Sequence, residues 1–201
     1  MYFPSLPLFS QLPSTGNQAF DMAAQIIFHH EGFWSNDPND PGGPTAWGWS
    51  LRAAKELGDL DGDDHLDLDL DFDGDVDVND IILLKDRPDI ALDLYKTVHW
   101  DKYRYDLLDP YLAIKLCDLS VNMGASQAHK LLQRSVRACG GQRLIDDGIL
   151  GKKTFAALSR LEADSLIPAL RSHAAGFYQL LACQRPTSRK YLNGWLNRAY
   201  F

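Results

Sequence analysis

The sequence predicts a mainly α-helical protein, and three observations support this. Apolar residues recur at the helical spacing of three and four, strand-like alternation is scarce, and Pro and Gly fall at the ends of the periodic stretches. Apolar residues make up 45% and charged residues 23% of the 201 residues, as in ordinary globular proteins. No apolar run approaches the roughly 18 residues of a membrane span, so we expect no membrane segment.

The first helix is expected over residues 17–30, because one apolar stripe runs through it. Glu31 lies three helical turns after Phe20 and therefore on the same stripe. Residues 32–50 form a loop rich in Pro, Gly, Asn and Asp, which leaves room for a small hairpin but disfavours helix. The stripe consists of Phe20, Ala23, Ala24, Ile27 and Phe28.

The remaining helices are predicted from periodicity and from residues typical of helix ends. Pro88 suits the first turn of a helix, Gly124 is typical of a helix stop, and Ser126 is a candidate cap for the next helix. The expected helices are 51–57, 81–84, 88–100, 110–123, 126–139, 154–161, 165–183 and 188–199.

The chain's charge is unevenly distributed. Eleven aspartates lie between Asp59 and Asp80, without a Lys or Arg among them. The formal net charge is −7, yet outside this segment 16 acidic residues stand against 20 basic ones, and such a body suits an anionic polymer. The sequence has no basic run or recognition motif for nucleic acid. The three cysteines, far apart and odd in number, are expected to be buried free thiols.

Glu31 is the candidate general acid. A carboxyl group on an apolar helix face is costly to ionise, and a carboxyl group that keeps its proton is what glycoside cleavage requires. The loop that follows supplies aromatic rings, glycines for close backbone approach, and the polar residues Asp40 and Thr45. The alternative is a glutamate that is simply exposed at a helix end.

The segment from Glu31 to Gly48 resembles the signature of glycoside hydrolase family 108, which contains N-acetylmuramidases. Phe33 fits as the aromatic residue of the signature but stands where a second glycine is usual, and Trp49-Ser50 departs from the signature as well. Further resemblances lie at 117–124, 132–134, 147–154 and 194–198, so the match spans about 18–200 apart from the acidic segment. The residues that fit the signature are Glu31, Gly32, Phe33, Asp37, Pro38, Asp40, Gly42, Gly43, Thr45 and Gly48.

The resemblance implies a lysozyme-like helical domain with Glu31 as the catalytic acid. Asp40 and Thr45 would position the attacking water or support positive charge on the sugar ring, although loop-stabilising roles fit both residues as well. Asn122 is a candidate substrate contact, and with Asp118 it also fits a structural polar cluster. The aromatic candidates for sugar platforms, which could equally be core residues, are Trp47, Trp49 and Trp100.

The acidic segment contains a calcium-loop pattern. From Asp69 it places Asp at positions 1, 3, 5, 9 and 12, Gly74 at position 6 and an apolar residue at position 8, as in EF-hands and dockerins. Asp75 would contribute its carbonyl, and a solvated acidic linker is the alternative. The Ca²⁺ ligands expected from this pattern are Asp69, Asp71, Asp73, Asp75, Asp77 and Asp80.

A second, irregular loop begins ten residues earlier with Asp59, Asp61 and Asp63. It lacks Gly at position 6, and its position 12 would be Leu70. The two starts are too close for two complete EF-hands, so a second ion would be bound irregularly, for example by sharing Asp69.

These observations predict a monomeric peptidoglycan hydrolase that cleaves the β-1,4 bond between N-acetylmuramic acid and N-acetylglucosamine. The alternative is a non-catalytic, calcium-dependent wall-binding or dockerin-like module. Residues 1–16 are expected to form an arm, 17–201 the muramidase domain, 59–84 the calcium-loop insertion and 144–201 a helical part resembling a peptidoglycan-binding region. Because residues 1–13 lack signal-peptide features, we expect synthesis in the cytoplasm and action at the cell wall after release by another route, such as a holin.

Overall fold

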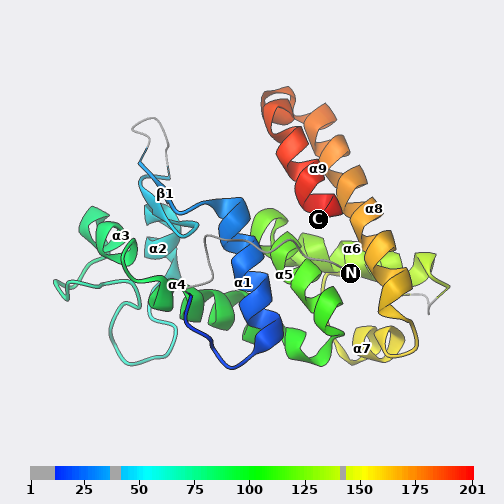
Figure 1. Cartoon of the computed structure of the whole chain (residues 1–201), viewed down its shortest axis with the longest axis horizontal. Helices are drawn as coiled ribbons and strands as arrows, with labels where there is room; N and C mark the ends of the chain where they lie inside the picture. The colour runs from blue at the N-terminus through cyan, green and yellow to red at the C-terminus, as the bar shows by residue number, and fades with distance from the viewer. Residues whose placement is uncertain (1–11, 37–41, 141–143) are drawn as a thin grey trace. The chain divides into compact units, whose positions relative to one another are not determined.

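The structure is a computed structural model, and it describes residues 12–36, 42–140 and 144–201. The chain divides into two compact units, Met1–Lys96 and Thr97–Phe201. Helices dominate both units and the strands are short, which confirms the prediction of a mainly α fold (Figure 1). The predicted domain boundaries remain a prediction.

The first unit is built on α1, Gln18–Glu31. Asn17 caps it by accepting a hydrogen bond from the backbone N–H of Phe20 at 3.0 Å. All five residues of the predicted apolar stripe are buried, which confirms the periodicity argument. Before the helix, the hydroxyl groups of Ser14 and Thr15 both donate to the Asp21 carboxylate at 2.6 Å, so this end of the predicted arm is attached to the first turn of α1.

A three-stranded antiparallel sheet follows α1 and contains the small hairpin that the sequence allowed. Its strands are β1 (Trp34–Ser35), β2 (Thr45–Ala46) and β3 (Trp49–Ser50), in that order. Ala46 pairs with Trp49, so Trp47 and Gly48 form a two-residue turn, and both have positive φ, 52° and 84°. That is the conformation of the hairpin turns whose twist matches the flanking strands.

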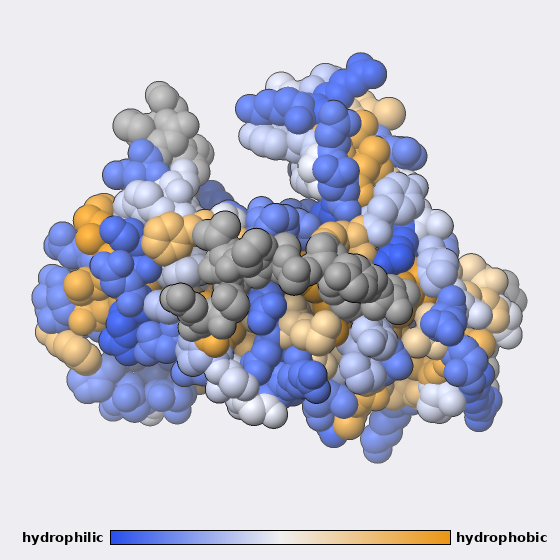
Figure 2. Space-filling model, viewed as in Figure 1, coloured by the Kyte–Doolittle hydropathy of each residue, from blue (hydrophilic) through white to orange (hydrophobic). Residues whose placement is uncertain are grey.

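Three helices complete the first unit: α2 (Leu51–Leu57), α3 (Val78–Leu84) and α4 (Pro88–Tyr95). α3 begins three residues earlier than expected, because Asp77 and Asp80 form a capping box at its start. Its buried residues Ile81 and Leu84 anchor it. Figure 2 shows hydrophobic surface over α3, to which the exposed side chains of Val78, Ile82 and Leu83 contribute.

The expected helix over 88–100 changes character at Lys96. The α-helical part ends at Tyr95. A π-helical turn, η2 (Lys96–Trp100), follows directly, and the boundary between the two units falls after its first residue. Two short 3-10 turns follow, η3 (Asp101–Tyr103) and η4 (Tyr105–Leu107), with Arg104 in the left-handed region between them. A side-chain period alone does not distinguish these helix types.

The second unit begins its helical body with α5 (Pro110–Met123), α6 (Ala125–Ala138) and α7 (Lys152–Leu158). Gly124, with φ 84°, ends α5 as expected. The predicted Ser126 cap is wrong: α6 starts at Ala125, so Ser126 already lies inside the helix and Gly124 serves as the cap residue without a side-chain bond.

The longest helix, α8 (Ala163–Gln184), packs against α5, α6 and α9 (Leu192–Tyr200), and η5 (Pro186–Tyr191) links it to α9 (Figure 1). Neither α8 nor any other helix in the described ranges combines the length and the apolar character that crossing a bilayer requires. The cysteines are free, but only Cys117 is buried, and Cys183 is exposed on α8.

A buried ionic cluster ties α9 to α5. The Asp118 carboxylate, 1% exposed, lies 3.5 Å from Lys115 Nζ and 3.6 Å from Arg198 Nε. Lys115 also donates to the carbonyl oxygen of Arg198. Burial lowers the pKa of Lys115 to about 8, while Asp118 opposes that shift.

Candidate active site

Glu31 is the last residue of α1, where its side chain is half-buried. Gly32 ends the helix with φ 82°, and its N–H donates to the carbonyl oxygen of Phe28 at 3.0 Å. The chain then enters β1, which pairs with the strand preceding the hairpin turn. The carboxyl group therefore lies at a rigid helix end beside the sheet.

The hairpin turn packs directly against the Glu31 side chain at Gly48. A Cβ atom at Gly48 would lie 3.1 Å from Cβ and 3.2 Å from Cγ of Glu31, and it would overlap the hydroxyl group of Tyr95. The turn also requires positive φ at this position. Gly48 is thus the point where α1, the hairpin and α4 meet, and it fixes the space around the Glu31 side chain.

A cluster of aromatic rings packs against this turn. The Trp47 ring lies 5.1 Å from that of Phe28, and its Nε1 donates to the carbonyl oxygen of Lys85 at 3.1 Å. The Tyr95 ring lies 5.5 Å from Phe28 and 5.3 Å from Trp49. The contact with Phe28 and the bond to Lys85 hold Trp47 in its uncommon left-handed conformation, which costs of order 1–3 kcal/mol.

The structure corrects the assignment of Trp47, Trp49 and Trp100 as sugar platforms. Their exposed fractions are 8%, 6% and 1%, so they are core residues, with Trp100 in the second unit beside Tyr105. Stacking on a sugar requires an accessible ring face, which these buried side chains do not offer.

The accessible aromatic residues that follow the end of α1 are Phe33 and Trp34, exposed by 43% and 36%. Phe33 packs edge-on against Trp47 at 4.7 Å, and the Lys85 ammonium lies 6.0 Å from the Trp34 ring. Sequence reasoning did not select this pair, or Tyr95, as site residues. Their position immediately after Glu31 and Gly32, where the helix ends, could have indicated that Phe33 and Trp34 lie at the site.

The two loop residues predicted to assist Glu31 have different outcomes. Thr45 is half-buried in β2, and its hydroxyl group reaches the Gly43 carbonyl oxygen at 3.5 Å, a long contact that fits the hairpin-stabilising alternative. Asp40, together with Asp37 and Pro38 of the signature, lies outside the described residues.

The second unit contains Asp118 and Asn122. Asp118 belongs to the buried ionic cluster, as the structural alternative predicted. Asn122 is exposed near the end of α5, and its Oδ1 accepts a hydrogen bond from the Tyr178 hydroxyl at 2.7 Å.

The acidic segment of the first unit folds into two loops of similar design. In the second loop, carboxylate oxygens of Asp69, Asp71 and Asp73 all lie within 4.8 Å of one another. Asp69 Oδ2 accepts from the N–H of Gly74 at 2.9 Å, and Gly74 has φ 96°. Desolvation raises the pKa of Asp71, and the charges of Asp73, Asp80 and Asp69 add to the rise.

The last two predicted ligands of this loop bond backbone amides instead. Asp80 is buried, and its two oxygens accept from the N–H groups of Leu70 at 2.7 Å and Asp77 at 2.6 Å. Asp77 accepts from the N–H of Asn79 at 2.5 Å. In this conformation both residues close the loop and start α3.

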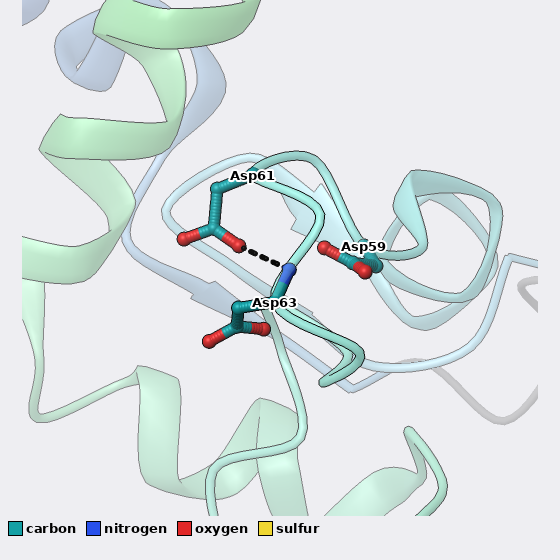
Figure 3. A group of neighbouring side chains, drawn as sticks. All are labelled: Asp59, Asp61 and Asp63. Atoms are coloured by element: carbon teal, nitrogen blue, oxygen red, sulfur yellow. Dashed lines mark hydrogen bonds between the residues drawn. The ribbon is translucent and has the colours of Figure 1, made fainter.

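The first loop gathers Asp59, Asp61 and Asp63 in the same manner, again with carboxylate oxygens within 4.8 Å of one another (Figure 3). Asp59 Oδ2 accepts from the N–H of Asp64 at 3.0 Å, which matches the bond that the N–H of Gly74 donates to Asp69. Asp64 occupies position 6 with φ 69°, so an aspartate adopts there the conformation expected of glycine. The two loops therefore share a backbone pattern that their residue types only partly reveal.

Comparison with known proteins identifies the class. The family described as Glycosyl hydrolase 108 matches residues 24–124, half of the chain, and a second family, described as Predicted Peptidoglycan domain, matches residues 127–200. A solved structure titled "Structure of Brucella abortus SagA" has a TM-score of 0.60 and 24% identity, covering 93% of this chain and 95% of that one. That likeness shows a shared fold. No curated protein matches the chain.

The chain is therefore a glycoside hydrolase with a mainly α, lysozyme-like fold. It belongs to the glycosyl hydrolase 108 family, and the two matched regions together make it a peptidoglycan hydrolase that acts at the bacterial cell wall.

Proposed function

We propose that the chain cleaves the β-1,4 bond between N-acetylmuramic acid and N-acetylglucosamine, with Glu31 as general acid. The observation that carries this proposal is the packing of the hairpin turn at Gly48 against the Glu31 side chain at the end of α1. This contact places a half-buried carboxyl group on a rigid element, as proton transfer to a bound substrate requires.

In the proposed reaction, Glu31 donates its proton to the glycosidic oxygen as the bond from the muramic anomeric carbon breaks. The departing sugar leaves with a hydroxyl group, and a water oxygen bonds to the anomeric carbon. Asp40 accepts a proton from this water, and Thr45 helps to position it. The exposed rings of Phe33 and Trp34 supply apolar faces for the sugar beside Glu31.

Product analysis tests the bond assignment. Digestion of purified peptidoglycan should release fragments with new reducing ends on N-acetylmuramic acid, identified by borohydride reduction and mass spectrometry. Reducing ends on N-acetylglucosamine would instead identify a glucosaminidase. New amines without reducing ends would identify an amidase or peptidase, and either result would refute the proposal.

We further propose that the two acidic loops bind Ca²⁺. Support comes from the donor set, because Ca²⁺ prefers carboxylate and carbonyl oxygens, and from the two groups of three converging carboxylates. In the second loop, Asp69, Asp71 and Asp73 would supply carboxylates and Asp75 its backbone carbonyl. In the first loop, Asp59, Asp61 and Asp63 would supply the carboxylates. A bound cation would offset the mutual repulsion of these side chains and stabilise the segment that leads into α3.

Calcium should raise the thermal stability of the chelator-treated protein. If the dissociation constant is about 10 μM, then 1 mM Ca²⁺ adds about 2.7 kcal/mol, which corresponds to roughly 5–10 °C in Tm for a chain of this size. Scanning calorimetry with and without Ca²⁺ measures the shift, and Mg²⁺ at equal concentration controls for ionic strength.

Variants separate specific binding from a general charge effect. Asp71→Asn with Asp73→Asn should abolish most of the calcium response of the second loop, and Asp61→Asn with Asp63→Asn that of the first. The matched control, Asp93→Asn with Asp106→Asn, removes two exposed carboxylates outside both loops and should leave the response intact. Absence of any calcium shift in the unmodified protein at millimolar concentration would refute the calcium proposal.

A further inference from the structure

A pocket of about 350 Å³ lies within the second unit. The end of α5, the start of α6, the C-terminal part of α8 and α9 line it. Its volume falls within the usual range for small-ligand sites, roughly 300–1,000 Å³. Methionine, phenylalanine and leucine side chains provide part of its wall, and three polar side chains, Asn122, Gln127 and Arg185, interrupt it.

Two stacked aromatic rings give this pocket a preformed wall. The rings of Tyr178 and Trp195 lie 5.4 Å apart with an interplanar angle of 21°. Tyr178 is fully buried, and its hydroxyl donates to Asn122 Oδ1 at 2.7 Å. That bond orients the Asn122 amide, whose NH₂ group can donate a hydrogen bond to a ligand.

The one charged side chain among the residues that line this pocket is the positive Arg185. Arg185 follows the last residue of α8 and is exposed, and Arg189 and Lys190 follow in η5, where Figure 2 shows mainly hydrophilic surface. Residues 165–201 contain no aspartate or glutamate. The positive residues of this stretch are Arg171, Arg185, Arg189, Lys190 and Arg198.

These features favour a small anionic ligand with apolar substituents. In peptidoglycan, the short stem peptides carry free carboxylates and alanine methyl groups, whereas the sugars that they modify are neutral once the lactyl group is amide-linked. A guanidinium group binds a carboxylate with strong, charge-assisted hydrogen bonds, and it gains little from a neutral sugar. Charge complementarity thus selects the peptide over the glycan strand.

We propose that this pocket binds the acidic stem peptide of peptidoglycan, with Arg185 holding a carboxylate and Asn122 donating to a peptide carbonyl. The proposal rests on the assignment of the chain as a peptidoglycan hydrolase and specifies which part of the polymer the second unit recognises. The pocket then distinguishes peptide-bearing from peptide-free glycan and holds the substrate through a part that does not react.

Binding measurements on the full chain test the proposal. In the Glu31→Gln background, which prevents turnover, calorimetry compares a disaccharide tetrapeptide with the same disaccharide lacking the peptide. The peptide-bearing ligand should bind more tightly. Arg185→Ala should weaken its binding by about tenfold or more, the scale of a lost charge-assisted bond, without changing the affinity for the peptide-free sugar.

Arg160→Ala is the matched control, because Arg160 is an exposed arginine of the same unit outside the pocket lining. It removes the same charge and should leave both affinities unchanged, with equal melting temperatures for the two variants. Equal binding of the two ligands, or peptide binding that survives Arg185→Ala, would overturn the proposal. The hydrolase assignment is tested separately, by the muramic reducing ends that the protein with native Glu31 releases. The hydrolase assignment and the peptide-binding proposal can therefore fail independently of each other.

Discussion

Glu31→Gln should reduce the release of reducing ends from peptidoglycan by about 10²–10⁴-fold. Glutamine keeps the size of the side chain and its packing against Gly48, but it has no proton to transfer to the leaving oxygen. The melting temperature should therefore stay close to that of the unmodified protein. A reducing-end assay at saturating substrate, together with circular dichroism, measures both quantities.

Glu56→Gln is the matched control for this substitution. Glu56 is an exposed glutamate of α2, in the same unit and with the same change of charge, so the variant should retain full activity. A folded Glu31→Gln protein that remained nearly as active as the control would remove Glu31 from the role of general acid. It would leave the family assignment without its expected catalytic residue.

The helical framework could be predicted because its signals are local. The stripe from Phe20 to Phe28 predicted both the helix and its buried face, and Pro110 and Gly124 indicated the bounds of α5. Local signals failed where two residues competed for one role. Gly124 serves both as the end of α5 and as the start of α6, so Ser126 is not needed as a cap.

The candidate site was predicted less completely, because burial depends on contacts between distant parts of the chain. Trp34 and Trp47 lie in the same loop, but only Trp47 faces Phe28 and the carbonyl of Lys85, so only Trp47 is buried. Nothing in the residue types indicates which of the two turns inward. Likewise Asp80 fits calcium position 12 by its spacing, and the structure shows its carboxylate bonded to backbone amides.

Gly48 is a residue whose full role could not be predicted from the sequence. The sequence places Gly48 within the family signature, where the conformation of the turn alone would be enough to explain a glycine. The structure shows a second requirement, since the Glu31 side chain and the Tyr95 hydroxyl occupy the space where a Cβ would lie. The turn and the end of α1 are therefore coupled through one residue.

Gly48→Ala should destabilise the first unit and impair the site. Positive φ costs an alanine about 1–2 kcal/mol, and the overlap with Tyr95 adds roughly 1–3 kcal/mol. The sum corresponds to a Tm lower by roughly 5–15 °C. Since the added methyl group also displaces Glu31, activity per folded molecule should fall by about 10–100-fold, the scale of a misplacement near 1 Å.

Two further variants distinguish steric overlap from backbone strain. Gly140→Ala introduces alanine at φ 78° where nothing lies within 4 Å, so it should cost only about 1–2 kcal/mol and leave activity unchanged. Tyr95→Phe removes the hydroxyl that the new methyl group meets. The double variant Gly48→Ala with Tyr95→Phe should therefore be more stable than the sum of the two single changes predicts. Strict additivity in this cycle would show that the Tyr95 hydroxyl does not limit the space at Gly48, and would contradict the steric contact between the turn and α4.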